Sequence, residues 1–397
     1  MRTSLWPRFI EQIGLCTRVS KSAIEEDYQK SKPNLSSLAF SANFLVTVDD
    51  SDFWTAGLGA QDLTVGEFSE LGRSERFDVV PLSGQIGQSD AAFVPEALNE
   101  PLFGALSTSS DETSPKTYAI LDAAKIFGLP ELLATSGLEH RCFYKGDMLD
   151  ELGDVAPWIV RLEAQNRLTQ NLFTQGDAAW HLWKDEAGIF LRSSQSLKTL
   201  WQHFRKFTKV QNSSGESVYF RFWEPHVAQA YLSVGGADAS GSPSLFHTSN
   251  GKIVDAVICF GTQDVSTVHY APEAFSEPGY RLTSAQERAL AQGEERRRRA
   301  DIATALRRCF PDQTEDVPQP ALIDTVGRVA HRMGAFGIRK VRNIHVLAGW
   351  QLFYGELFER RDPHGELYNI CRSGLGEDAK LVQMQNRMDT LHSAGVF

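Results

Sequence analysis

Tyr118-Ala-Ile-Leu-Asp-Ala-Ala124 begins the stretch of sequence that decides the fold, and this stretch continues to Leu232. Its first residues have the pattern of a buried strand that enters a loop, and Ile126–Ser136 follows with the spacing of a short amphipathic helix. Cys142–Tyr144 and Trp158–Val160 are typical of further short strands, each closed by charged or turn-forming residues. The alternation of strands and helices predicts an α/β fold, in which helices cover a central sheet.

Near its end the same stretch contains an aromatic cluster, Phe220-Arg-Phe-Trp-Glu-Pro225. In a strand, Phe220 and Phe222 point to one side while Arg221 and Trp223 point to the other, so one pair belongs to the core and the other to a surface. Arg and aromatic side chains are frequent at the centre of protein interfaces. We therefore expect four residues to contribute to partner binding: Trp158, Arg221, Trp223 and Glu224. The alternative is structural, with Arg221 paired to Glu224 or Asp122 to hold the edge of the sheet.

Length and charge indicate how the chain is organised. Its 397 residues exceed what one hydrophobic core usually organises, which predicts two or three folded units. The net charge of −10 argues against non-specific binding of nucleic acid. Thirteen Asp or Glu and two Arg lie between Pro33 and Pro115, so this region alone carries −11. We predict an acidic N-terminal extension over residues 1–115, as either a small β-containing subdomain or an acidic arm, followed by an α/β domain over 116–278.

The pattern becomes helical after Pro278. Ser284 and Glu287 have the spacing of a capping box, in which each side chain satisfies the other's exposed backbone N–H. Apolar residues then recur at helical intervals, and Pro320 suits a first helical turn. These apolar positions are Ile302, Leu306 and Phe310, followed by Leu322, Val326, Val329 and Met333. A C-terminal all-helical lobe is predicted over 279–397, and Ile253–Phe260 before it predicts a strand that joins the central sheet.

Candidates for chemistry are few. His140 and Cys142 lie on the same side of a predicted strand and could form a base and a nucleophile, but no orienting acid is identifiable. His181, His203 and His226 lack the spacing of a zinc site, and neither a dinucleotide fingerprint nor a phosphate-binding loop occurs. We predict no catalytic residue, no cofactor and no metal site.

The densest basic run is Arg296–Arg299, which lies between Glu294, Glu295 and Asp301. This arrangement predicts a helix face with internal charge pairs. The alternative is a docking site for an acidic surface, either of a partner or of this chain's own acidic region.

The five cysteines lie far apart without a CxxC pair, which favours free thiols in a reducing compartment. Glu11 interrupts the N-terminal apolar stretch, so a signal peptide is not expected. No apolar run approaches the length of a membrane span. We predict a cytoplasmic protein whose partners include neither nucleic acid nor a membrane.

The order of these pieces resembles the type VI secretion effector adaptors, called Tap or Tec proteins, which are built around one α/β domain. The resemblance rests on six pieces: Leu121–Ala123, Phe143–Gly146, Val155–Val160, Gly188–Leu191 with Ser193 and Ser194, a helix over Leu197–Val210, and Phe220–Pro225. Two positions depart from the family, which usually has Asp in place of Glu224 and often Arg in place of His226.

The resemblance implies a non-enzymatic adaptor or chaperone. Such a protein binds an effector toxin, through the N-terminal region of that effector, and helps to load it onto the VgrG spike. The resemblance also implies a helical lobe after the α/β domain. Two alternatives stay open: a hydrolase that uses Cys142 with a histidine brought near by folding, and an acidic region, Pro33–Pro115, that shields a basic partner.

Overall fold

The computed structural model describes residues 73–83, 92–105, 115–234, 241–261, 266–272 and 277–396. The described residues up to Glu294 form one compact unit, and those from Glu295 onward form another. The domain boundaries predicted after residues 115 and 278 stay predictions. A strand-like piece at Phe44–Val48 and most of the Gly- and Ser-rich stretch 235–244 lie outside the described residues.

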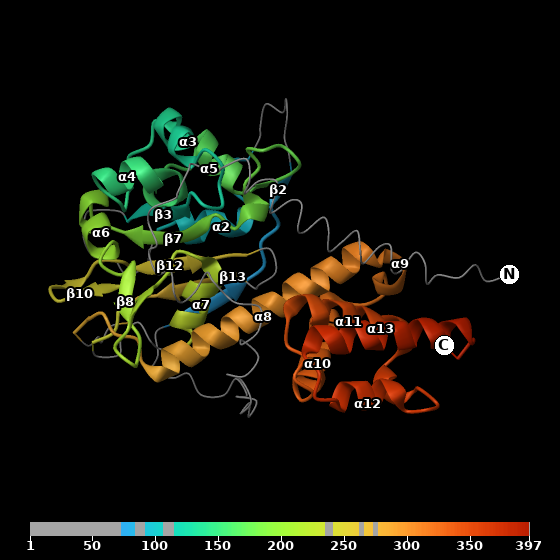
Figure 1. Cartoon of the computed structure of the whole chain (residues 1–397). Helices are drawn as coiled ribbons and strands as arrows, with labels where there is room; N and C mark the ends of the chain where they lie inside the picture. The colour runs from blue at the N-terminus through green and yellow to red at the C-terminus, as the bar shows by residue number, and fades with distance from the viewer. Residues whose placement is uncertain are drawn as a thin grey trace. The chain divides into compact units, whose positions relative to one another are not determined.

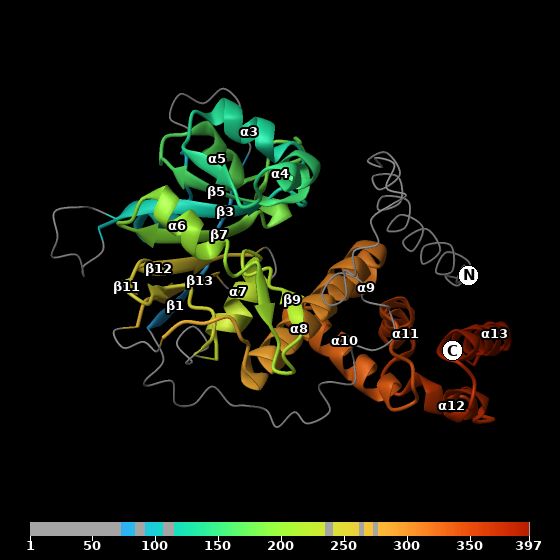
Figure 2. The same ribbon diagram turned by 60° about the vertical axis from the view of Figure 1, so that its left-hand side comes forward.

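Among the described residues of the first unit, seven strands form one sheet, and every neighbouring pair is antiparallel. Their order is β1 (Ser74–Phe77), β13 (Ser266–Tyr270), β12 (Ala256–Cys259), β7 (Gly188–Ser193), β3 (Lys116–Asp122), β5 (Pro157–Leu162) and β4 (His140–Cys142). Figures 1 and 2 show helices on both sides of this sheet. The predicted fold, a central sheet covered by helices, is confirmed, and so is the prediction that Ile253–Phe260 adds a strand to it.

Both faces of the sheet are buried, because successive side chains of a strand point to opposite sides. Tyr118 and Ile120 of β3 pack into a core formed with α6 (Leu197–Phe204) and α7 (Pro225–Leu232). The alternate residues Ala119 and Leu121 pack into a second core. That core is covered by α2 (Glu96–Phe103), α3 (Leu129–Ser136) and α5 (Arg167–Leu172).

Two predicted helices have different ends in the structure. The helix expected from Ile126 begins at Leu129, because Gly128 takes a positive φ of 67° and Pro130 then suits the first turn. The helix expected over Leu197–Val210 ends at Phe204. The chain then forms β8 (Lys209–Gln211), which pairs with β9 (Ser217–Tyr219) in a hairpin.

Short elements complete this unit. They are α4 (Asp147–Leu152), the 3₁₀ turns η2 (Gly153–Val155) and η3 (Trp183–Asp185), the parallel pair β2 (Leu82–Ser83) and β6 (Thr174–Gln175), and the antiparallel pair β10 (His247–Thr248) and β11 (Gly251–Lys252).

The helix α8 (Ser284–Cys309) begins in the first unit and ends in the second. Its N-terminus has a capping box one residue earlier than the sequence predicted. The Gln286 N–H donates to Thr283 Oγ1 (3.2 Å), and the Thr283 N–H donates to Gln286 Oε1 (2.8 Å). Glu287, the predicted member, instead accepts from the N–H and hydroxyl of Ser213 in the β8–β9 turn. The prediction of Ser284 and Glu287 is therefore wrong by one residue.

The second unit is helical, as predicted. After α8 come α9 (Pro311–Thr314), α10 (Gln319–Gly334), α11 (Val341–Tyr354), the 3₁₀ turn η5 (Phe358–Arg360), α12 (Glu366–Arg372) and α13 (Glu377–Ser393). The predicted apolar positions in α8 and α10 are all buried in its core, and so is Phe310, which follows the last residue of α8. Arg299 pairs with Glu295 one helical turn away, so internal pairing within the Arg296–Arg299 run is confirmed for this residue.

A buried ion pair stabilises the helical unit. Arg387 of α13 donates from Nε (2.9 Å) and Nη2 (2.7 Å) to the carboxylate of Asp362, which also accepts the N–H groups of His364 and Leu367. These hydrogen bonds hold the pKa of Asp362 well below its usual range, with the bonds from Arg387 as the largest cause.

The cysteines follow the prediction in part. Cys142, Cys259 and Cys371 are buried free thiols, whereas Cys309 is disulfide-bonded, so the prediction of free thiols is wrong at that residue.

Candidate protein-binding surface

Four charged side chains meet where β3 ends and α7 begins. Arg221 Nη2 lies 2.5 Å from Asp122 Oδ2, and Arg221 Nε bonds Glu224 Oε1. Lys125 Nζ lies 3.3 Å from Glu224 Oε2. The structural alternative for Arg221 is thus confirmed, and the side chain pairs with both predicted carboxylates at once. We call Asp122, Lys125, Arg221 and Glu224 the ionic cluster.

Burial and charge act in opposite directions within the ionic cluster. Burial raises the pKa of Asp122, although Arg221 opposes this effect. Burial also disfavours the charged form of Glu224, but Lys125 and Arg221 together outweigh it and lower the pKa of Glu224. Arg221 therefore favours the charged form of both carboxylates, against the effect of burial.

The ionic cluster extends through His226 to α8. His226 Nδ1 lies 3.8 Å from Glu224 Oε2, and Nε2 lies 3.4 Å from Glu294 Oε2. Glu224 and His226 are the two positions where this chain departs from the adaptor pattern. In this chain the two side chains lie within ion-pair distance of each other.

The aromatic residues of the segment Phe220–Pro225 do not lie in a strand, so the prediction that they alternate between two faces of a strand is wrong. β9 ends at Tyr219, and the next residues turn into α7, whose first residue is Pro225. The turn buries Phe220, Phe222 and Trp223 together instead of alternating them. Trp223 is only 2% exposed, so the isolated chain offers almost none of its side chain to a partner.

Trp158, the fourth predicted binding residue, lies apart from the other three. It packs with the second core, covered by α3 and α5, whereas Trp223 belongs to the core under α6 and α7. Trp158 is half-buried, and its indole N–H donates to the carbonyl of Gly153 (2.9 Å). The structure brings Arg221, Trp223 and Glu224 together and leaves Trp158 on the opposite face of the sheet. Their role in partner binding stays a prediction.

The pair behind the hydrolase alternative is held by local hydrogen bonds. The Cys142 thiol accepts the N–H of Tyr144 (3.3 Å), and burial raises its pKa, whereas a nucleophilic cysteine needs a lowered one. His140 Nδ1 lies 2.8 Å from the carbonyl oxygen of Leu138 and donates to it. Neither group is arranged as an activated nucleophile and base in this structure.

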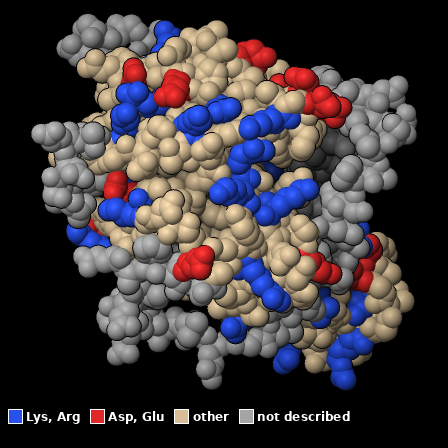
Figure 3. Space-filling model, turned by 90° about the vertical axis from the view of Figure 1, so that its left-hand side faces the viewer, with Lys and Arg blue, Asp and Glu red and all other residues tan. Residues whose placement is uncertain are grey.

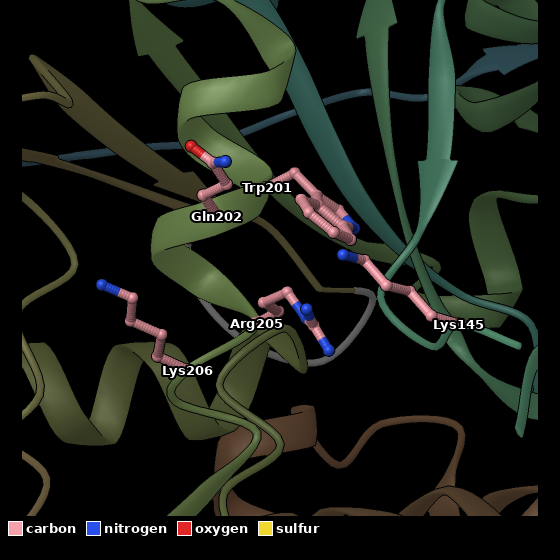
Figure 4. Close-up of a pocket in the computed structure, with 5 residues that line it drawn as sticks. All are labelled: Lys145, Trp201, Gln202, Arg205 and Lys206. Carbon is pink, nitrogen blue, oxygen red and sulfur yellow. The ribbon is translucent and has the colours of Figure 1, made fainter.

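The sequence interpretation missed a cationic pocket at the end of α6. This pocket has a volume of about 590 Å³ and is lined by Lys145, Trp201, Gln202, Arg205 and Lys206. Figure 4 shows the amino group of Lys145 and the guanidinium of Arg205 pointing toward the space beside Trp201, while Lys206 points away. On the face that carries α6, Lys and Arg side chains gather across the middle of the surface (Figure 3).

Trp201 organises the cations of this pocket. Its indole N–H donates to the carbonyl of Cys142 (2.7 Å), which fixes the ring in the core. Three cationic groups then lie near the ring centroid: Arg141 Cζ at 3.8 Å, Lys145 Nζ at 4.3 Å and Arg205 Cζ at 4.8 Å. Cation–π attraction holds them close together. Sequence reasoning used Lys145, and the helix that contains Trp201 and Arg205, only as pieces of a family pattern. It did not place them together, because β4, its following loop and α6 are distant in sequence.

Comparison with known proteins identifies the central part of the chain. Residues 117–240 match the model of a family described as a domain of unknown function, DUF4123. This domain is known to occur in type VI secretion effector adaptors. The match runs from β3 beyond α7 and so includes the ionic cluster and the cationic pocket. We found no curated protein and no solved structure that matches the chain.

Two further findings concern the described residues. No helix among them is long and apolar enough to cross a membrane. No group of three or more His, Cys, Asp or Glu side chains in the same part of the chain is placed to hold a metal ion.

Proposed function

We propose that this protein is a non-enzymatic, cytoplasmic adaptor or chaperone of a type VI secretion system, which binds an effector toxin and helps to load it onto the VgrG spike. The observation that carries the proposal is the match of residues 117–240 to a domain that occurs in such adaptors. The proposed contact on the effector is its N-terminal region.

The geometry of the matched region supports a binding role. The ionic cluster fixes the turn into α7 with charges that satisfy one another, which suits a structural scaffold. The cationic pocket presents Lys and Arg side chains at the surface beside the buried ring of Trp201, and Arg is frequent at the centre of protein interfaces.

An affinity pull-down tests the proposal. The tagged full-length protein is purified from its native cells while the secretion system is expressed, and co-purifying proteins are identified by mass spectrometry. We expect a large multidomain toxin together with a spike protein, absent from a mock purification of untagged cells. Recovery of neither protein under these conditions would overturn the proposal.

A further inference from the structure

The segment that follows α6 lines a second, separate pocket. This second pocket has a volume of about 420 Å³ and is lined by Lys209, Val210, Gln211, Ser217, Tyr280 and Arg281. Its residues come from β8, β9 and the segment before α8. The two pockets and the Trp201 ring together have six basic residues beside them, which we call the basic strip: Arg141, Lys145, Arg205, Lys206, Lys209 and Arg281.

The chain itself connects the two pockets. Arg205 and Lys206 follow the last residue of α6, and Lys209 begins β8 three residues after Lys206. Between them, the ring of Phe207 packs against His203 (4.8 Å) and against Tyr280 (5.9 Å) of the second pocket. Because Phe207 is buried, this packing links α6, which lines the first pocket, to Tyr280 of the second pocket.

The cations of the strip have no acidic partner in the described part of the chain. Arg281 donates to a backbone carbonyl, that of Ser213, and no carboxylate pairs with any of the six. Desolvation, followed by the charges of Arg205 and Arg141, lowers the pKa of Lys145. Like charges held together in this way repel one another, and a bound anion would relieve the repulsion.

Aromatic side chains lie between and beside these charges. Lys209 Nζ lies 5.0 Å from the ring centroid of Tyr219. Tyr219 and Tyr280 are 39% and 50% exposed, so both offer apolar surface to a ligand. A small free anion would occupy one pocket and leave the other empty. An extended peptide can place carboxylates at both pockets and apolar side chains against the rings.

We propose that the basic strip docks an acidic segment of the protein that this chain carries, with Asp or Glu side chains meeting the cations of both pockets. This inference rests on the proposed function. A nucleic acid fits less well, because the acidic region between Pro33 and Pro115, which carries −11, would repel a long polyanion more than a short acidic segment.

Fluorescence anisotropy on the full-length protein tests the inference without any knowledge of the cargo. The probe is a fluorescein-labelled synthetic peptide in which Glu alternates with Leu, and the matched peptide has Lys in place of Glu. We expect the Glu peptide alone to bind, with an affinity that falls as salt is raised. Arg205→Glu and Lys145→Glu should each weaken binding about tenfold, through lost attraction and added repulsion.

Arg167→Glu is the matched control, because Arg167 is an exposed residue of α5 on the other side of the sheet and its substitution changes the net charge by the same amount. The affinity of this variant for the Glu peptide should equal that of the unmodified protein. Thermal unfolding of each variant shows whether it folds. Lys145 lies in a loop, so Lys145→Glu keeps the test informative if Arg205→Glu destabilises the end of α6.

Three results would overturn the inference. One is equal binding of the Glu peptide by all variants. Another is inorganic phosphate binding that responds to Arg205→Glu while peptide binding does not, which would make the strip a simple anion site. The third is a variant with Asp49→Asn, Asp50→Asn and Asp52→Asn together that binds the Glu peptide about tenfold more tightly. This chain's own acidic region would then be the occupant of the strip, because neutralising it removes a competitor of the peptide.

The pull-down separates the two proposals. Cargo recovered equally by the unmodified protein and by the Arg205→Glu variant overturns the role of the strip alone. Peptide binding that depends on Arg205 and Lys145, without recovery of any toxin or spike protein, overturns the adaptor function alone.

Discussion

Arg221 shows how one side chain organises a site. It forms ion pairs with Asp122, whose side chain is 1% exposed, and with Glu224, which lies at the start of α7. We expect Arg221→Met to lower the free energy of unfolding by about 3 kcal/mol, because it leaves the buried carboxylate of Asp122 without its ion-pair partner. Urea denaturation at neutral pH measures the change.

A double variant separates the charge from the packing. Asp122→Asn together with Arg221→Met should be more stable than Arg221→Met alone, because the asparagine does not need a cation. Arg221→Lys should fall between the original protein and Arg221→Met, since lysine keeps the charge but loses the forked geometry. A double variant no more stable than Arg221→Met would show that Asp122 does not depend on this pairing.

The buried histidine His203 predicts a dependence of stability on pH. Burial lowers its pKa to about 4, and its Nε2 donates to the carbonyl of Ser244 (2.8 Å). Below about pH 6.5 His203 takes up a proton in the unfolded chain but stays neutral in the folded chain, so acidification lowers the free energy of unfolding. The expected slope from this residue averages about 1 kcal/mol per pH unit between roughly pH 6.5 and 5.

His203→Gln is the test of this slope, because glutamine also donates to the carbonyl but does not titrate. Urea denaturation at several pH values should give a shallower dependence for the variant. Burial also lowers the pKa of His269 to about 4, so part of the slope should persist. An unchanged slope in His203→Gln would contradict the prediction.

At the scale of elements, the start of α8 provides a sharp comparison between neighbouring residues. We expect Thr283→Ala to cost about 1 kcal/mol of unfolding free energy, because it removes the capping hydroxyl. Ser284→Ala should cost almost nothing, since alanine is favourable in the first turn of a helix. Urea denaturation of the two variants decides between the capping box of the structure and the one that the sequence predicted.

The sequence predicted the elements better than their ends. β3 and the apolar faces of α8 and α10 were predicted because their periodicity is carried by many residues. The ends of α3 and α6 were missed because single features decide them, such as the positive φ of Gly128 and the pairing of β8 with β9. Residues 220–223 look like a strand locally, yet they form a turn that leads into α7, and tertiary packing buries Phe220, Phe222 and Trp223 together.

At the scale of the whole molecule, each of the two units has its own hydrophobic core. Asp362→Asn should therefore destabilise the helical unit while leaving the sheet intact, because it removes the charge that Arg387 binds. Hydrogen exchange should accelerate in α12 and α13 and stay unchanged in β3, β5 and β7. Equal acceleration in both units would show that they unfold together.

Acid should weaken the same ion pair. Because the pKa of Asp362 is lowered in the folded state, its contribution to stability is present above the unfolded value of about 3.9 and is lost as the pH falls below it.

The cationic pocket could not be predicted from the sequence, because it depends on contacts between elements that are distant in the chain. Arg141, Lys145 and Arg205 are unremarkable in sequence, and only the packing of β4 against β5 and α6 places them around one indole ring.

The position of β1 at the end of the sheet has a consequence for how the protein is made. Phe77 of β1 pairs with Ser266 of β13, and β13 is its single neighbour in the seven-stranded sheet. During synthesis on a ribosome, β1 emerges early and cannot pair with β13 until that strand has also emerged. A product that stops before Ser266 leaves both β1 and an edge of β12 exposed, and exposed strand edges promote aggregation. Completion of the sheet thus depends on synthesis having passed Tyr270.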